Sequence, residues 1–253
     1  MIERAAVEAA LHRLYIAAPG TSLRAEDHKK SLEIVGILSE VERLVDVDKP
    51  RSRFHLVDAA AGKAYVGLLA AELVFAPRSR PVDVTLIERD AGRASACTEA
   101  IGRLRAGAGT CKVAQSDVGD ASAWPETPDL VVALHACGPA SDAVIERSAG
   151  CQARHLLLVP CCVSHQVAAA RLALQRAEAM GLPRQAEVRR RFVQAFVDSD
   201  RMLSLEAVGY ETNVVSFVPP TVTPHHLLWR ARRVREPVRM AEASRRRALL
   251  HAD

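Results

Sequence analysis

Two short motifs hold the side chains of this sequence that are best able to do chemistry. They read L-H-A-C-G-P-A-S-D from Leu134 to Asp142 and V-P-C-C-V-S-H from Val159 to His165. Each begins at the end of an apolar run, and imidazole and thiol groups can accept protons, attack as nucleophiles or bind metals. The candidate catalytic residues in these motifs are His135, Cys137, Cys161, Cys162 and His165.

The two histidines are the candidate general bases. An imidazole exchanges protons near neutral pH, which suits the removal of a proton from a hydroxyl or a cationic amine. His135 also has a structural interpretation, in which its ring holds backbone groups of the loop. His135 and His165 therefore remain alternatives for the base, and His135 is either catalytic or structural.

The cysteines of the two motifs can bind a metal, be buried as small apolar groups, or line a substrate pocket. The patterns H-x-C and C-C-x-x-H offer thiolate and imidazole ligands to zinc. Adjacent cysteines on an extended chain point to opposite sides, however, so only one of Cys161 and Cys162 fits easily into a tetrahedral site. The paired C-x₂₋₄-C spacing of structural zinc sites is absent. We expect no metal, and we assign Cys97, Cys111 and Cys151 to packing.

Acidic residues follow three other strand-like runs, at Asp58, Glu88 and Asp117. The carboxyl ends of neighbouring parallel strands meet at one edge of a sheet, and ligands bind beyond that edge. We therefore expect the three acids to share a pocket. Negative charge in this pocket suits a ligand that carries positive charge.

The turn after the first strand reads V-D-A-A-A-G-K-A-Y from Val57 to Tyr65. It lacks both the P-loop pattern and the G-x-G-x-x-G of dinucleotide-binding folds. Lys63 falls in the first turn of a predicted helix, where a cation opposes the helix dipole by about 0.3–1 kcal/mol. Lys63 is therefore either a solvated surface residue or the partner of a bound anion.

The elements that must position these residues alternate between strand and helix from residue 54 onward. This alternation predicts a parallel sheet with helices on both faces, closed by a final pair of strands. Strands are predicted over 54–57, 82–87, 111–115, 130–134, 155–159, 210–218 and 227–230, and helices over 65–75, 90–106, 140–149 and 166–208.

Helical segments flank the sheet region on both sides. Helix-stop residues at Pro19-Gly20 and Lys49-Pro50 predict the ends of two N-terminal helices. We therefore divide the chain into an N-terminal helical cap (1–50), a sheet domain (51–235) and a basic helical tail (236–253).

The excess positive charge lies at the end of the chain. The formal net charge is +4, but residues 227–253 hold eight arginines and three acidic residues, so the rest of the chain carries −1. One interpretation is a contact with RNA or with an acidic protein. The other is a solvated helix in a protein that prefers arginine to lysine. The sequence does not predict an oligomeric state.

The composition is that of a globular protein, with 49% hydrophobic and 25% charged residues in 253. The apolar runs are far shorter than the roughly 20 residues that a membrane helix needs. The N-terminus begins with charge rather than an apolar signal segment. Six cysteines in this length do not indicate a disulfide framework. We expect a cytoplasmic protein with reduced thiols and no membrane contact.

The first loop resembles that of class I S-adenosylmethionine-dependent methyltransferases, whose first motif is D/E-x-G-x-G-x-G. Asp58 matches the acid and Gly62 the second glycine, whereas Ala60 and Ala64 replace the first and third. Alanine narrows the dihedral angles open to the turn and the room for a ligand. We therefore expect cofactor binding that is weakened rather than abolished.

The two chemical motifs are similar to those of a methyltransferase subgroup with H-A/L-C-G/D and P-C-C-x-x-H/K. The segment Thr223 to Leu228, T-P-H-H-L-L, fits the T-P-x-N/H element of that subgroup. Members include glutathione-transferase-C-terminal-domain-containing proteins, methyltransferase-like proteins and, more distantly, the tRNA 2′-O-methyltransferases of the acceptor stem. All four motifs occur in the same order here.

The resemblance implies an α/β Rossmann-like fold, with a seven-stranded, mostly parallel sheet, helices on both faces and an N-terminal helical extension. It implies S-adenosyl-L-methionine as cofactor, with Glu88 at the ribose and Asp117 at the adenine. The residues expected to bind this cofactor are Asp58, Ala60, Gly62, Lys63, Glu88, Asp117, Leu134 and His135.

The predicted function is methyl transfer to an unidentified acceptor, either an RNA hydroxyl or base or a protein side chain. Such a transfer is an in-line displacement, and alignment of the reactants can contribute about 7–11 kcal/mol. The alternative is a catalytically degraded methyltransferase-like module that binds RNA or a protein through the basic tail.

Overall fold

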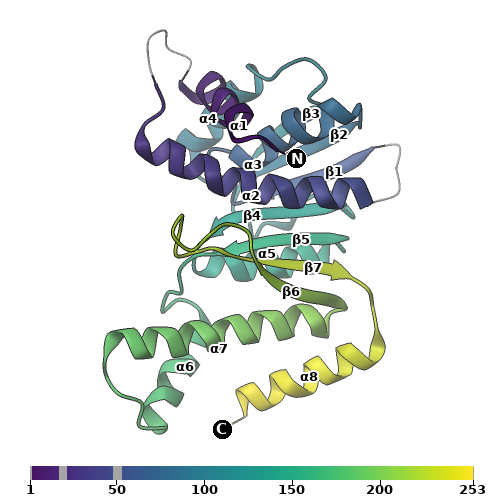
Figure 1. Cartoon of the computed structure of the whole chain (residues 1–253). Helices are drawn as coiled ribbons and strands as arrows, with labels where there is room; N and C mark the ends of the chain where they lie inside the picture. The colour runs from purple at the N-terminus through teal and green to yellow at the C-terminus, as the bar shows by residue number, and fades with distance from the viewer. Residues whose placement is uncertain (1, 17–21, 48–52, 253) are drawn as a thin grey trace.

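A seven-stranded sheet forms the centre of the computed structural model, which describes residues 2–16, 22–47 and 53–252 (Figure 1). The strands are β1 (Phe54–Ala59), β2 (Val82–Glu88), β3 (Thr110–Gln115), β4 (Leu130–Ala136), β5 (His155–Pro160), β6 (Tyr210–Ser216) and β7 (Leu227–Arg233). Their order in the sheet is β3-β2-β1-β4-β5-β7-β6. β7 is antiparallel to both of its neighbours, and the other neighbours are parallel. The predicted Rossmann-like, mostly parallel sheet is confirmed.

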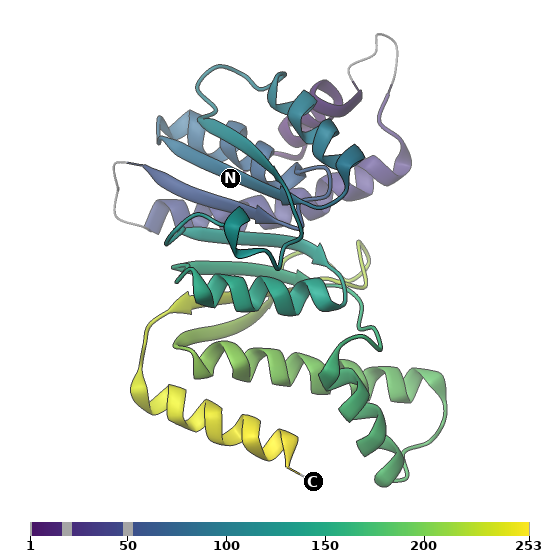
Figure 2. The same cartoon turned by 180° about the vertical axis from the view of Figure 1, so that it is seen from behind.

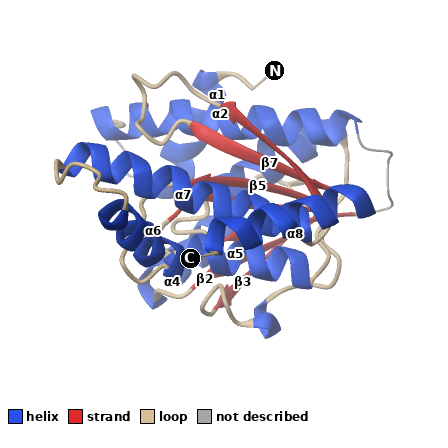
Figure 3. Ribbon diagram, turned by 90° about the horizontal axis from the view of Figure 1, so that it is seen from below, coloured by secondary structure: helices blue, strands red, loops and turns tan. Residues whose placement is uncertain are grey.

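Helices cover both faces of this sheet (Figures 1 and 3). They are α1 (Arg4–Leu11), α2 (Ala25–Val47), α3 (Tyr65–Ala70), α4 (Ala91–Ile101), α5 (Pro139–Gly150), α6 (Ala168–Ala179), α7 (Ala186–Ala207) and α8 (Pro237–His251). α1 to α4 share one hydrophobic core with the sheet, and α5 and α7 share a second core on the other face. Figure 2 shows α5 packed alongside the strands on that second face.

Apolar runs place the central strands as the sequence predicts. β4 and β5 are buried along most of their length, as expected for parallel strands covered on both faces. The structure extends β4 to Ala136, beyond the predicted end at residue 134. It also ends α4 at Ile101, five residues before the predicted helix end.

The N-terminal helices are packed into the main core and do not form a separate layer. Val7, Leu14, Ile34 and Leu38 are fully buried in the same core as Phe54 of β1. The predicted helix ends at Pro19-Gly20 and Lys49-Pro50, and the boundary at residue 50, lie outside the described residues. No helix in the described ranges is long and apolar enough to span a membrane.

The basic end of the chain is held by carboxylates of the protein. Asp200 of α7 accepts hydrogen bonds from Arg247 (2.7 Å) and interacts with His251 (2.6 Å) of α8. Six of the eight arginines in residues 227–253 pair with carboxylates, namely Arg230, Arg232, Arg239, Arg245, Arg246 and Arg247. Much of the positive charge of this segment is therefore compensated within the molecule.

Gly36 of α2 lies directly against the loop between β6 and β7, and a larger residue should disrupt this contact. A methyl group at position 36 would meet the carbonyl oxygen of Phe217, and it would lie 2.9 Å from a side-chain atom of Val218. We expect Gly36→Ala to reduce the free energy of unfolding by about 1–3 kcal/mol, as overpacking does. Chemical denaturation measures this change.

Gly150→Ala is the matched control, because a methyl group at that helical position has no neighbour within 4 Å. It should leave the stability unchanged or raise it slightly, since alanine favours a helix over glycine. Equal stability of both variants and the wild type would contradict the close packing of α2 on this loop.

Candidate active site

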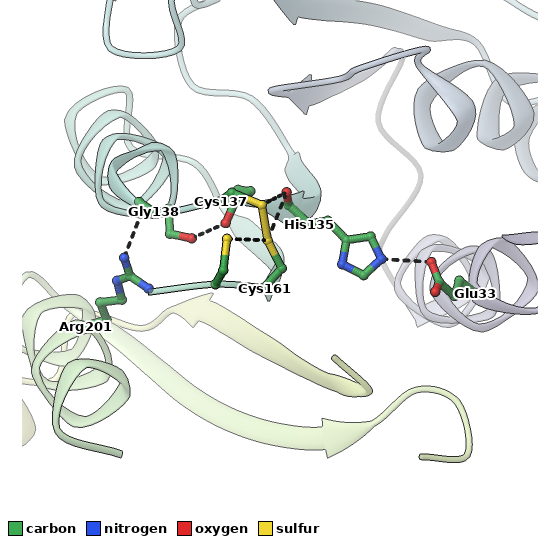
Figure 4. The surroundings of a disulfide bond; sticks show 9 residues. Glu33, His135, Cys137, Gly138, Cys161 and Arg201 are labelled. Carbon is green, nitrogen blue, oxygen red and sulfur yellow. Dashed lines mark hydrogen bonds and ion pairs between the residues drawn. A yellow bond between two sulfur atoms is a disulfide. The ribbon is translucent and has the colours of Figure 1, made fainter. Parts of the chain in front are cut away.

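A β-bulge near the end of β4 sets the direction of His135. The pairing of β4 with β5 shifts register between Leu134 and Ala136, and His135 has a φ of +63°. A residue other than glycine in this left-handed region costs about 1–3 kcal/mol, and bulges commonly re-aim a side chain near a functional site. Figure 4 shows the imidazole of His135 extending toward Glu33 of α2.

Glu33 and His135 form a carboxylate–imidazole pair. The distance from His135 Nε2 to Glu33 Oε2 is 2.8 Å, and Lys30 Nζ donates to the same oxygen at 2.7 Å. Although burial acts to raise it, hydrogen bonds from His135 and Lys30 lower the pKa of Glu33 to about 2. An ionised carboxylate only accepts hydrogen bonds, so Nε2 carries a proton. In the neutral ring the lone pair then lies on Nδ1, which has no hydrogen-bond partner among the described residues.

His225, from the loop between β6 and β7, packs edge-on against His135 with ring centroids 5.9 Å apart. Burial lowers the pKa of His225, and electrostatic interactions with His135 and Arg190 lower it further, against the opposing effect of Glu33. The neutral form of His225 is therefore favoured beside the carboxylate–imidazole pair.

A cavity of about 560 Å³ lies beyond the carboxyl ends of the parallel strands, and we name it the strand-end cavity. Six of the sequence-predicted site residues line it, namely Ala60, Glu88, Asp117, His135, Cys137 and Cys162. The sequence therefore identified residues at the ends of five strands that the fold brings to one cavity.

Glu88 and Asp117 supply the carboxylates of the strand-end cavity. Glu88 is only 5% exposed, and its two oxygens accept hydrogen bonds from the backbone N–H groups of Gly62 (2.7 Å) and Asp90 (2.9 Å). Asp117 is more exposed and accepts a bond from the N–H of Gly119 at 2.8 Å. Glu88 thus ties the first loop to the turn after β2.

The first loop adopts a conformation that normally requires glycine. Ala60, Gly62 and Ala64 all lie in the left-handed region, with φ values of 53°, 60° and 57°. Each alanine there costs about 1–3 kcal/mol. The two alanines that stand in place of glycines therefore occupy the left-handed region despite this cost. The expected weakening of cofactor binding stays a prediction.

Asp58 lies beneath the first loop and does not line the strand-end cavity. It is 2% exposed, and its Oδ2 accepts a hydrogen bond from the N–H of Gly67 in α3 at 2.8 Å. Burial, reinforced by the charge of Glu88 and opposed by the Gly67 hydrogen bond, raises the pKa of Asp58 to about 7. The expectation that all three acids face one pocket is therefore wrong for Asp58, because its strand carries it into the core before the chain turns.

Three other predicted residues also lie elsewhere. Lys63 lines a separate cavity of about 420 Å³, together with Tyr15 and Lys30. Leu134 packs against the main hydrophobic core. Gly62 does not line the strand-end cavity, but its backbone N–H donates a hydrogen bond to Glu88, which does.

A second cavity, of about 470 Å³, adjoins the first, and we name it the α6–α7 cavity. It shares Cys162 and Ser164 with the strand-end cavity. Its other lining residues include Cys161, His165, Arg189, Arg190 and His225. The Arg189 guanidinium donates to the backbone carbonyls of Leu182 and Pro183, and Arg190 pairs with Glu187.

The cysteines differ from their predicted state in one way. Cys137 and Cys161 form a disulfide, which corrects the expectation that all thiols are reduced (Figure 4). Of the interpretations left open for the motif cysteines, burial does not hold, because Cys137 and Cys162 are exposed and Cys161 is only partly buried. Each of the three lines at least one of the two cavities. Cys97 is buried, as predicted for a packing residue, and Cys111 and Cys151 are partly buried.

Sequence reasoning missed Glu33 and Arg201. Glu33 lies one helical turn before Ile37 and two turns before Val41, and both of these residues are buried. A charged residue in line with the apolar face of a helix is the sequence feature that could have identified Glu33. Arg201 is 2% exposed and bonds Asp142 at 2.6 Å and the carbonyl of Gly138 at 2.9 Å. The bond with Arg201 gives a structural role to Asp142, the last residue of the first motif.

Comparisons with known proteins show the family and the fold. Residues 29–170 match the sequence model of a family described as a methyltransferase domain. The structure is similar to the CMeT domain of the citrinin polyketide synthase, with a TM-score of 0.50, 13% identity, and coverage of 90% of this chain and 60% of that one. It is also similar to a magnesium protoporphyrin IX methyltransferase from Synechocystis with bound S-adenosylhomocysteine, with a TM-score of 0.49, 13% identity, and coverage of 89% and 93%. No curated protein sequence matches the chain.

The buried carboxyl of Asp58 should make stability depend on pH. Its pKa rises from an ordinary 3.8 to about 7 on folding, so the folded state binds more protons than the unfolded state between these values. Stability from this group is therefore present below pH 4 and is lost as the pH rises to about 7, by up to about 4 kcal/mol. Asp58→Asn, which still accepts the Gly67 N–H bond, should remove this loss.

Denaturation at a series of pH values from 4 to 8 checks the prediction. The variant should gain stability relative to the wild type as the pH rises. Asp83→Asn, at a half-buried carboxylate of β2 that pairs with Arg53 at 2.6 Å, is the control. A constant difference between wild type and Asp58→Asn across this range would contradict the assignment.

Proposed function

This chain belongs to the family of methyltransferase domains, with S-adenosyl-L-methionine as its cofactor, and we propose that it transfers a methyl group to a hydroxyl or base of RNA. The junction of the strand-end cavity with the α6–α7 cavity carries this proposal. The strand-end cavity holds two carboxylates, two arginines (Arg89 and Arg93) and His135. Among the described residues, the α6–α7 cavity holds arginines and histidines without a carboxylate, and the two cavities meet at Cys162 and Ser164. A cytoplasmic location remains part of the proposal.

The residues of the strand-end cavity fit the cofactor. Its volume lies within the range of about 300–1,000 Å³ that is typical of small-molecule sites. The carboxylates of Glu88 and Asp117 can accept hydrogen bonds from ribose hydroxyls and from the adenine amine. S-adenosyl-L-methionine supplies an electrophilic methyl group on a positively charged sulfur. Arg89 and Arg93 line the same cavity and balance the two carboxylates, so the fit rests on the hydrogen-bond acceptors rather than on a net negative charge.

His135 is the base that the geometry supports best. Its Nε2–H is held by the ionised Glu33, so the proton acceptor of the neutral ring is Nδ1, which is buried and has no hydrogen-bond partner among the described residues. The fixed tautomer resembles the way a buried carboxylate orients a catalytic histidine. His135 also lines the strand-end cavity, whereas His165 lines only the α6–α7 cavity.

The α6–α7 cavity is the proposed entrance for the acceptor. Arg189 and Arg190 lie in its wall, and arginine binds phosphate groups well because its donors form a planar fork. This feature favours an RNA nucleotide over a protein side chain. The alternative of a module that binds RNA through its tail is less favoured, because none of the described tail arginines lines either cavity.

Removing the charge of Glu88 should weaken cofactor binding. We expect Glu88→Gln to reduce the affinity for S-adenosylhomocysteine by at least about tenfold, since a hydrogen bond to a charged group contributes about 1.5–3 kcal/mol. Calorimetry measures the dissociation constant. Asp83→Asn, at the other end of the same strand, should bind like the wild type. A wild type that does not bind S-adenosylhomocysteine would overturn the proposed function.

Removing the imidazole of His135 should slow methyl transfer with little effect on cofactor binding. We expect His135→Gln to lower kcat by about 10²–10⁴-fold, the usual contribution of a general base. Glu33→Gln should lower it less, because it leaves the imidazole in place. The matched control, His55→Gln, changes a histidine of β1 that lines neither cavity and should retain activity.

Transfer of tritium-labelled methyl groups from S-adenosyl-L-methionine to total RNA and to total protein measures this activity. Both fractions come from cells that lack this chain. Label in RNA that depends on His135 supports the proposal. Label in protein alone would contradict the proposed acceptor class.

A further inference from the structure

Three sulfur atoms lie together in the wall between the strand-end cavity and the α6–α7 cavity. They belong to Cys137, which follows β4, and to Cys161 and Cys162, which follow β5. All three Sγ atoms lie within 4.8 Å of one another. The proposed methyl transfer uses none of these sulfurs, so their clustering requires a separate explanation.

The two adjacent cysteines point to the same side of the chain. Their Sγ atoms are 3.6 Å apart, which corrects the expectation that they diverge. β5 ends at Pro160, so Cys161 and Cys162 no longer follow the alternation of a strand. In a tetrahedral zinc site with bonds of 2.3 Å, neighbouring sulfurs lie about 3.8 Å apart, close to the separation seen here.

The backbone that carries the sulfurs is held by contacts other than the disulfide. The N–H of Gly138 donates to the carbonyl of Cys162 at 3.0 Å, and the Gly138 carbonyl accepts a bond from the buried Arg201. The loops after β4 and β5 therefore stay together when the Cys137–Cys161 bond is reduced. Two of the three sulfur-bearing side chains, Cys137 and Cys162, are exposed, so an ion can reach the cluster.

We propose that the reduced thiols of Cys137, Cys161 and Cys162 bind one zinc ion. A thiol reductant first gives two electrons and two protons to the Cys137–Cys161 disulfide, and the reductant is itself oxidised to a disulfide. The three cysteines then coordinate Zn²⁺ as thiolates, and each releases its proton. Zinc is the common metal for such soft ligands.

Three protein ligands leave the fourth position of a tetrahedral ion open. Cys137 and Cys162 line the strand-end cavity, and Cys161 and Cys162 line the α6–α7 cavity. The open position therefore lies in the shared wall, where a group of the acceptor can occupy it. The site itself does not depend on the proposed methyl transfer, because it rests on the positions of the sulfurs alone.

Zinc titration of the reduced full chain against a chromophoric chelator tests the site. We expect one ion per chain, with the release of one proton per thiol. Zinc binding should weaken by about 100-fold or more in each of three variants, Cys137→Ser, Cys161→Ser and Cys162→Ser. This loss exceeds the roughly 10–100-fold that is typical when a residue that only hydrogen-bonds a metal ligand is changed. Cys151→Ser, at a partly buried thiol outside the cluster, should bind zinc like the wild type.

X-ray absorption of the zinc-loaded wild type counts the ligands without any variant. A shell of three sulfur atoms at about 2.3 Å supports the site. No zinc binding by the reduced wild type, fewer than three sulfurs, or unchanged affinity in any of the three variants would overturn it. Binding of S-adenosylhomocysteine, measured on the same samples, shows that each variant is folded and tests the cofactor site independently.

Discussion

The hydrogen bond between Glu33 and His135 is the contact on which the arrangement of the site depends. It joins a helix near the start of the chain to a bulge in the middle of the sheet. Ionised Glu33 makes this a charge-assisted bond, whose contribution of about 1.5–3 kcal/mol offsets the strained backbone of His135. Because Gly36 also brings α2 against the loop that carries His225, the N-terminal helices are part of the active-site structure.

The two adjoining cavities differ in charge. In the strand-end cavity, Glu88 and Asp117 are balanced by Arg89 and Arg93, whereas the α6–α7 cavity is lined by Arg189 and Arg190 without a carboxylate from the described part of the chain. The α6–α7 cavity is therefore the more positive of the two. The arginines of α8 line neither cavity and pair with acidic side chains of the protein.

Local patterns predicted the strands and the loops that follow them, because apolar runs and helix-stop residues act over short distances. Glu88 and Asp117 were found for the same reason, since Glu88 is the last residue of β2 and Asp117 lies two residues beyond β3. The side chain of Asp58 follows the same pattern but lies in the core, because β1 continues two residues past its predicted end, to Ala59. The direction of His135 depends on a bulge, and the partnership with Glu33 spans 102 residues, so neither has a periodic signal. The convergence of Cys161 and Cys162 likewise arises where the strand pattern stops.

The position of β7 between β5 and β6 has a consequence for biosynthesis. The parallel strands are complete in the first 160 residues and the lining of the strand-end cavity in the first 166, but the edge of β5 stays unpaired until residues 227–233 emerge from the ribosome. The segment with His225 directly precedes β7 and is anchored only when that strand inserts. A nascent chain can therefore assemble its parallel strands early, while the part of the α6–α7 cavity that contains His225 forms only after β7 has been synthesised.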